Sequence, residues 1–350
     1  MRTREKKSTG FRCPSLICSF PIYPSLIYSS LIYPFLIYSF LICLSLTLPG
    51  EPPPPTLTLA FVGDVMLGRG VAQALDGDWD AAFVGVQPWL AQADLAFANL
   101  ESPLTTAPFA PPSDGMARRY DLRAPPEAVA ALRGAGFDVV SLANNHALDA
   151  GPAGLAQTAA TLGKVEIAGL VDDGRIYPST HLPAYRFLAF DDSVEPLDVH
   201  AAAGAVAAAA DGGGLVIVSV HWGGEYQASP SLRQRTVARA LALAGADLVI
   251  GHGPHVLQRV EWVGDTLVAY SLGNFLFDQP YPADCRWGAV LRVAVQGDRI
   301  VAVDALPTVV QRGRVRRAAS EDGAAILARL DLDPVSRIQH QLSSTQEQPS

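Results

Sequence analysis

From about residue 56 onward, short apolar runs alternate with stretches rich in alanine and leucine. The apolar runs predict buried strands, and the clearest cover residues 57–62, 94–98, 137–142, 215–220 and 247–250. Apolar spacing, an early proline and terminal glycines predict helices over residues 125–135, 151–162, 198–210 and 231–244. This alternation is typical of an α/β fold, in which helices flank a sheet.

The pattern changes after His255. Four strands are predicted in succession, over residues 256–263, 266–270, 288–295 and 299–310, with Gly-Asp pairs at the hairpin turns. A second, largely antiparallel region is therefore expected. We predict one α/β domain over residues 56–332, built from two packed sheets with helices outside, a last helix over 321–330, and a disordered tail over 333–350.

Polar residues follow the predicted strands. In an open α/β sheet the carboxyl ends of the strands form the crevice where ligands bind, so these residues are expected to converge. Imidazole, carboxylate and amide oxygen donors suit Mn, Fe or Zn, and two such metals can hold a phosphate between them. We predict divalent metal ions, one or two, held by Asp64, Glu101, Asn145, His221, His252 and His255.

Other polar residues near these strand ends receive different roles. His146 follows Asn145 directly and is predicted to act as the general acid that protonates the leaving oxygen. Secondary or substrate-contacting roles are expected for Asn99, Asn144, Arg69 and Asn274, and Asn99 is also an alternative to Glu101 as a ligand.

Each block also has a purely structural interpretation. Asp64 could cap the next helix, Asn144 and Asn145 could be turn residues, and His221 could be an ordinary buried histidine. For any one of these polar segments taken alone, the structural interpretation is at least as good as a role in a metal site. A shared site is favoured because five successive strand ends carry such residues.

Composition argues against a nucleic-acid-binding protein and against a cysteine-based metal site. The chain has a formal net charge of -8 and 17% charged residues, which predicts no basic stripe for a nucleic acid backbone. Of the four cysteines, only Cys285 lies in the predicted domain, so neither an intradomain disulfide nor a cysteine zinc site is expected. Any metal must be held by nitrogen and oxygen.

The first 55 residues differ from the rest. Basic residues precede an uncharged stretch over 14–48, which is long enough to span a bilayer, and a proline-rich spacer follows at 51–55. We predict a single-pass membrane protein with a cytoplasmic N-terminus and an extracellular C-terminal domain. If the start codon is assigned too early, the protein is instead cytoplasmic or secreted.

Several of the chemistry-bearing segments also carry a resemblance. The chain reads GDVMLGR at 63–69, ANLESPL at 98–104, AGFDVVSLANNH at 135–146 and SLGNF at 271–275. With the histidine blocks at 221 and 252–255, these segments resemble the CapA family of capsule (poly-γ-glutamate) synthesis proteins, over roughly residues 57–310. That family is similar to the calcineurin-like metallophosphoesterases. The resemblance implies a four-layer α/β/β/α sandwich with two central mixed sheets and a dinuclear metal site.

The chain departs from the family pattern at two donor positions. Met66 stands where a calcineurin-like enzyme has a histidine ligand, and a thioether is a poor ligand for hard divalent ions. His252 lies one position further upstream of His255 than in many relatives.

Two functions from different classes follow. The first is a metal-dependent hydrolase at the cell surface, acting on a phosphoester or on an anionic capsule polymer such as poly-γ-glutamate. The alternative is a non-catalytic accessory protein that binds the polymer during its synthesis, export or anchoring. The expected partners are the anionic polymer, the membrane and other capsule-synthesis proteins.

Overall fold

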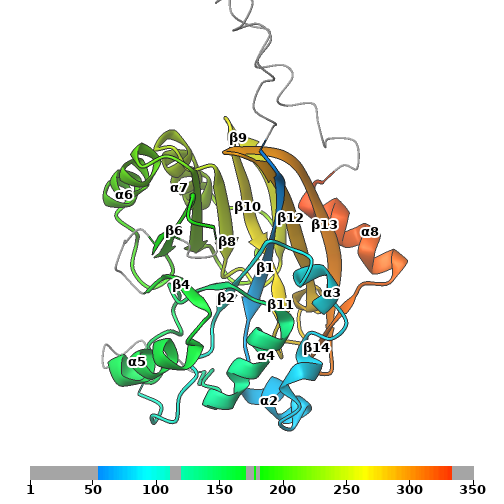
Figure 1. Ribbon diagram of the computed structural model, residues 1–350. Helices are drawn as coiled ribbons and strands as arrows, with labels where there is room; N and C mark the ends of the chain where they lie inside the picture. Colours follow the sequence, from blue (N-terminus) through cyan, green and yellow to red (C-terminus); the bar gives the residue numbers. More distant parts are fainter. Residues whose placement is uncertain (1–53, 111–119, 171–176, 179–181, 333–350) are drawn as a thin grey trace, which may run out of the picture. The chain divides into compact units, whose positions relative to one another are not determined.

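Two β-sheets packed face to face form the centre of the molecule (Figure 1). The computed structural model describes residues 54–110, 120–170, 177–178 and 182–332, which all belong to one compact unit. The first sheet has the order β14-β13-β12-β1-β2-β3-β4, with β11 also paired to β1, and the second has the order β5-β6-β7-β8-β10-β9.

The eight strands of the first sheet come from both ends of this unit. They are β1 (Thr56–Val65), β2 (Leu95–Leu100), β3 (Val139–Ser141), β4 (Glu166–Gly169), β11 (Asn274–Leu276), β12 (Trp287–Gln296), β13 (Arg299–Gln311) and β14 (Arg314–Arg317). The six strands of the second sheet are β5 (Tyr177–Pro178), β6 (Tyr185–Asp191), β7 (Leu215–His221), β8 (Leu248–His252), β9 (Leu257–Val263) and β10 (Thr266–Leu272).

Three apolar layers define the architecture. Alternate residues of β1 point to opposite faces, so Leu59 and Phe61 enter the layer between the sheets while Ala60 and Val62 face outward. Across the inner layer, Phe97 stacks on Phe187 with 6.0 Å between ring centroids. Burial of one such ring stabilises the fold by roughly 1.5–3 kcal/mol.

Helices cover both outer faces. The first sheet is covered by α2 (Arg69–Leu75), α3 (Gln87–Leu90), α4 (Val129–Ala135) and α5 (Gly151–Leu162), and the second by α6 (Val199–Asp211) and α7 (Leu232–Leu243). The last helix, α8 (Ser320–Leu330), adds Ile326 and Leu330 to the layer between the sheets. The predicted four-layer α/β/β/α sandwich with two mixed sheets is confirmed.

The segment after His255 is not a separate antiparallel region. The hairpin of β9 and β10 completes the second sheet, whereas β12, β13 and β14 extend the first sheet from β1. The strands are antiparallel to their sequence neighbours, as predicted, but β9–β10 and β12–β14 extend different sheets, each of which also contains parallel strands. Pairing with a partner far away in sequence decides this, and hydrophobic alternation does not encode the partner.

Three predictions fall partly or wholly outside the described residues: the membrane-spanning segment, its proline-rich spacer and the C-terminal tail. Within the described ranges, none of the helices has the length and apolar character needed to cross a bilayer.

Candidate metal centre

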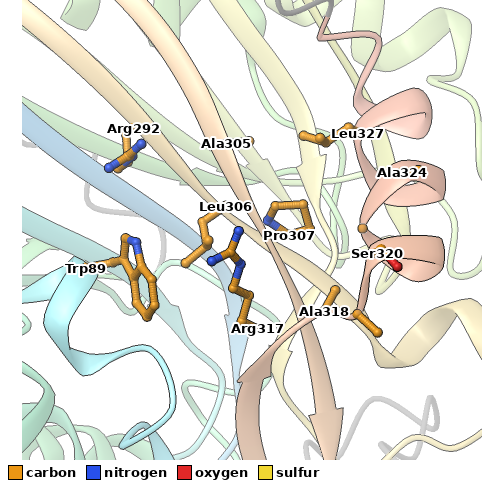
Figure 2. A pocket seen from close by; sticks show the side chains of 12 residues that line it. Trp89, Arg292, Ala305, Leu306, Pro307, Arg317, Ala318, Ser320, Ala324 and Leu327 are labelled. Atoms are coloured by element: carbon orange, nitrogen blue, oxygen red, sulfur yellow. The ribbon is translucent and has the colours of Figure 1, made fainter.

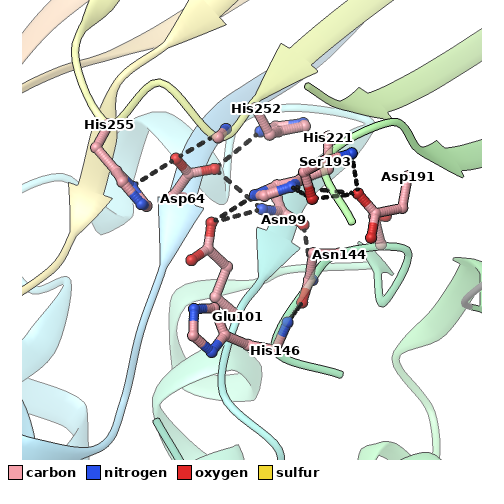
Figure 3. A network of polar contacts seen from close by, with 12 residues as sticks. Asp64, Asn99, Glu101, Asn144, His146, Asp191, Ser193, His221, His252 and His255 are labelled. Atoms are coloured by element: carbon pink, nitrogen blue, oxygen red, sulfur yellow. Dashed lines mark hydrogen bonds and ion pairs between the residues drawn. The ribbon is translucent and has the colours of Figure 1, made fainter. Parts of the chain in front are cut away.

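The carboxyl ends of parallel strands from both sheets meet at one place. The strands β1, β2 and β3 are parallel in the first sheet, and β6, β7 and β8 are parallel in the second. Asp64 lies near the end of β1 and Glu101 follows β2, while His221 and His252 end β7 and β8. These side chains face one another across the inner layer (Figure 3).

Asp64 is fully buried and lies between two histidines. Its Oδ2 is 3.2 Å from Nδ1 of His255, and its Oδ1 is 3.3 Å from Nδ1 of His252. The backbone N–H of Gly253 donates to Oδ2 at 3.3 Å, and Nδ2 of Asn99 donates to Oδ1 at 2.9 Å. Burial opposes ionisation of Asp64, but the contacts with the two histidines outweigh it and hold its pKa well below 3.8.

Gly253 can approach this carboxylate because it has no side chain. Its φ is +102°, and a Cβ there would lie 2.8 Å from the backbone oxygen of Trp222 and 3.1 Å from the ring of His221. His255 also has a positive φ, +58°, which is uncommon for a residue with a side chain. Backbone conformations of this kind gather at functional sites.

Glu101 connects the two sheets. Its Oε1 is 3.2 Å from Nε2 of His221, and Nδ2 of Asn99 donates to the same oxygen at 3.1 Å. Nδ1 of His221 lies 3.2 Å from Oγ of Ser193 and 3.6 Å from Oδ1 of Asp191. Asp191, at the end of β6, therefore orients the His221 ring.

The pKa values of His221 and His255 are both raised above that of a free histidine. Burial alone would lower the pKa of His221, but its contacts with Asp191 and Glu101 raise it to about 10. Burial likewise opposes the charge on His255, and Glu101 and Asp64 raise its pKa to about 9. Metal ions compete with protons for such nitrogens.

Several buried donor atoms fit a metal ion. One ligand atom each from Asp64, Glu101 and His255 lie within 4.8 Å of one another. Within the described part of the chain, Oε2 of Glu101, Oδ1 of Asn145 and Nε2 of His252 have no hydrogen-bond partner, and Nδ1 of His252 has only its 3.3 Å contact with Asp64. Buried polar atoms are almost always paired, so the first three point to a missing partner. Nitrogen and oxygen donors around two buried carboxylates suit a divalent cation.

His146 is positioned differently from the other histidines. Its Nδ1 lies 3.0 Å from Oδ2 of Asp149, which is fully buried and also accepts from the backbone N–H of Leu122. Its backbone N–H donates to Oδ1 of Asn144, and Nδ2 of Asn144 donates to Oδ1 of Asn99. The ring is therefore oriented through Nδ1 by a carboxylate.

The remaining predicted residues lie at the margin. Oδ1 of Asn274 lies 3.0 Å from Nδ1 of His255, so Asn274 orients a candidate ligand. Arg69 pairs with Asp278, and its guanidinium carbon is 5.9 Å from the ring centre of Phe277, which itself lies 4.9 Å from the ring of His255. Asn145 is only half-buried, although its Oδ1 is buried.

Met66 belongs to an apolar cluster and not to the group of donors. It is fully buried in the apolar layer beneath the helices, and its Sδ accepts from the backbone N–H of Gly68 at 3.0 Å. The sequence reasoning missed Asp149, Asp191 and Ser193. Asp191 carries the same signal as the predicted donors, a polar residue that ends an apolar run, but no strand was predicted over residues 185–191.

Comparison with known protein families assigns the chain to one of them. The model of the family described as bacterial capsule synthesis protein PGA_cap matches residues 58–175 and 178–279, which include every candidate donor. The chain belongs to this family. The predicted resemblance to CapA proteins is thereby confirmed.

Two named relatives of this chain agree with this assignment. The chain is 33% identical over 245 residues to the PGA biosynthesis protein CapA of Bacillus subtilis (strain 168), covering 64% of each protein. It is 30% identical over 298 residues to the capsule biosynthesis protein CapA of Bacillus anthracis, covering 75% of this chain and 70% of that protein. The chain thus spans just under two thirds of the Bacillus subtilis relative. Among solved structures, a hypothetical protein from Thermus thermophilus is 19% identical with a TM-score of 0.45, covering 72% of this chain and 98% of that one.

Proposed function

We propose that this protein is a metal-dependent hydrolase that acts at the cell surface on a phosphoester or on an anionic capsule polymer of the poly-γ-glutamate type. The observation that carries the proposal is the convergence of Asp64, Glu101 and His255 within 4.8 Å, beside a His252 ring whose Nε2 has no hydrogen-bond partner in the described chain. Relatives named for PGA and capsule biosynthesis support the choice of polymer.

Asp64, Glu101, His221, His252 and His255 would hold the metal, with Asn145 as a further oxygen donor. A divalent cation supplies Lewis-acid polarisation of a phosphoryl or carbonyl oxygen. Asp191 and Ser193 hold the ring of His221 in place, and Asn99 fixes the two carboxylates relative to each other. His146 would donate the proton that the leaving oxygen requires, because Asp149 orients its ring.

Arg69 would contact the anionic substrate. Its side chain is 30% exposed and lies next to Phe277, which packs on His255, so it is accessible beside the candidate ligands. Asp278 orients the guanidinium.

The second candidate function is a polymer-binding accessory protein without turnover. Met66 favours it, because its sulfur is held in the apolar core and leaves one metal position without its usual histidine. A more distant relative carries the name probable polyglutamine synthesis accessory protein.

Metal content and turnover separate the two functions. The purified protein should contain at least one equivalent of Mn, Fe or Zn and should hydrolyse a generic aryl phosphodiester. Asp64→Asn should lose both the metal and the activity, whereas Asp304→Asn, far from the donors, should lose neither. A wild type that is folded but contains no metal and shows no turnover would favour the accessory function.

A further inference from the structure

Four arginines gather at one edge of the first sheet. Arg312 lies in the turn before β14, and Arg314, Arg316 and Arg317 lie on β14 itself, the last strand of the sheet. We call these four residues the arginine edge. They lie beyond residue 279, where the family match ends, and they stand out in a chain with a net charge of -8.

The arginine edge has no carboxylate partners within the described part of the chain. Arg69, Arg233 and Arg292 each pair with an aspartate, but no ion pair or hydrogen bond joins a described residue to the side chains of the arginine edge. Three of its members are exposed, and Arg314 is half-buried. Its positive charge is therefore available to a ligand.

A cavity of about 480 Å³ lies beside Arg317 (Figure 2). Leu306, Pro307 and Trp89 contribute apolar side chains to its lining. The second arginine that lines it, Arg292, is neutralised by Asp304 through contacts of 2.6 and 2.9 Å. The acidic first turn of α8 contributes neither Glu321 nor Asp322 to the lining. Among the described residues that line this cavity, Arg317 is thus the charged one without a carboxylate partner.

The register places Arg317, at one end of the arginine edge, near the level of the candidate metal centre along the strands. Phe61 pairs with Leu291, Leu291 with Ala305, and Thr308 with Arg317. A register shift between Phe61 and Asp64 adds one residue to β1, so Asp64 lies at the level of Pro307, next to Thr308, on β13, which runs in the same direction. Three strand spacings separate β1 from β14, about 15 Å in total.

We propose that the arginine edge and the cavity beside Arg317 form a binding site for a linear polycarboxylate chain, which is held there near the level of the metal centre. Guanidinium groups bind carboxylates through paired hydrogen bonds, and a chain with a carboxylate on every unit can contact several arginines at once. The choice of a capsule polycarboxylate as the ligand rests on the proposed function.

Binding of fluorescently labelled poly-γ-glutamate to the full chain, followed by anisotropy, tests the site. The double variant R316E/R317E should bind about tenfold more weakly, a loss of about 1.4 kcal/mol, and with a shallower dependence on salt. The matched control is R239E/R299E, which reverses two exposed arginines elsewhere and should bind within twofold of the wild type. R316K/R317K keeps both charges and should retain most of the binding.

Several results would overturn the site. They are a lack of binding by the wild type, an equal loss in both charge-reversal pairs, or tighter binding of duplex DNA or polyphosphate than of poly-γ-glutamate. Melting temperatures identify any variant that fails to fold. If R316E/R317E does not fold, binding by R316K/R317K tests the site instead. Turnover of the aryl phosphodiester should be unchanged in R316E/R317E. If the wild type does not hydrolyse the aryl phosphodiester, the proposed hydrolase function is wrong. The anisotropy measurement would still show whether the polymer binds at the arginine edge.

Discussion

The histidines of the site differ in what their ring nitrogens contact. Nδ1 of His146 contacts Asp149, which is not one of the clustered donors, whereas Nδ1 of His255 lies 3.2 Å from Asp64. His146→Asn should therefore leave the metal content unchanged and lower turnover by roughly 10²- to 10⁴-fold. His255→Ala should lower both. Elemental analysis and steady-state kinetics check this, and equal metal loss in both variants would make His146 a ligand.

Met66 offers a test of the departure from the family pattern. Because its side chain lies in the apolar core, Met66→His would bury an imidazole there and should lower the free energy of unfolding by roughly 1–3 kcal/mol without adding metal. Met66→Leu keeps the volume and should cost less than about 1.5 kcal/mol. Urea unfolding and metal analysis measure both quantities. A second metal equivalent in Met66→His would show that the side chain can turn toward the site.

At the level of residues, the sequence could predict most of the polar cluster but not its contacts. Asp64, Glu101 and the three histidines were found because each follows an apolar strand. Asn145 is predicted as a metal ligand and Asn144 as a secondary residue, but the sequence of two adjacent amides does not reveal which of them bonds to Asn99. Only the fold shows that Asn144 bonds to Asn99 while Oδ1 of Asn145 has no partner among the described residues.

At the level of elements, local pattern was sufficient where an element carries its own signals. The helix predicted over 151–162 coincides with α5, and α7 begins after Ser231, whose capping box with Gln234 fixes its start. The strands β4, β5, β6, β11 and β14 lie outside the strand ranges predicted from the sequence. The last two are short and are stabilised by pairing with distant strands, which leaves little signal in their own residues.

The close approach of β1 to the turn at Gly273 should control the position of Asp64. A Cβ on Gly63 would lie 1.9 Å from the backbone oxygen of Gly273, and that oxygen accepts from the N–H of Asp64. Gly63→Ala should therefore separate β1 from this turn, cost roughly 1–3 kcal/mol and reduce metal content. Thermal unfolding and elemental analysis measure the effect.

Gly204, inside α6, is the matched control, because a Cβ there would contact nothing within 4 Å. Gly204→Ala should stabilise the protein by roughly 0.5–1 kcal/mol, since alanine favours the helix. Equal behaviour of the two variants would contradict the steric argument at Gly63.

For the whole molecule, the N-terminal segment makes a separate prediction. Because residues 14–48 carry no charge and follow basic residues, the full chain should pellet with membranes, whereas a chain that begins at Glu51 should stay in the supernatant. Ultracentrifugation with an immunoblot measures the partition. Full-length protein in the supernatant with an intact N-terminus would reject the anchor.

The candidate donors come from both sheets: Asp64 and Glu101 from the first, His221 and His252 from the second. A bound cation would cross-link the two halves of the sandwich, so unfolding must release it. Chelation should then lower the melting temperature, and metal at 100 times its Kd should restore about 2.7 kcal/mol. His252→Ala should abolish that response. Calorimetry with and without chelator would thus measure metal occupancy before any substrate is known.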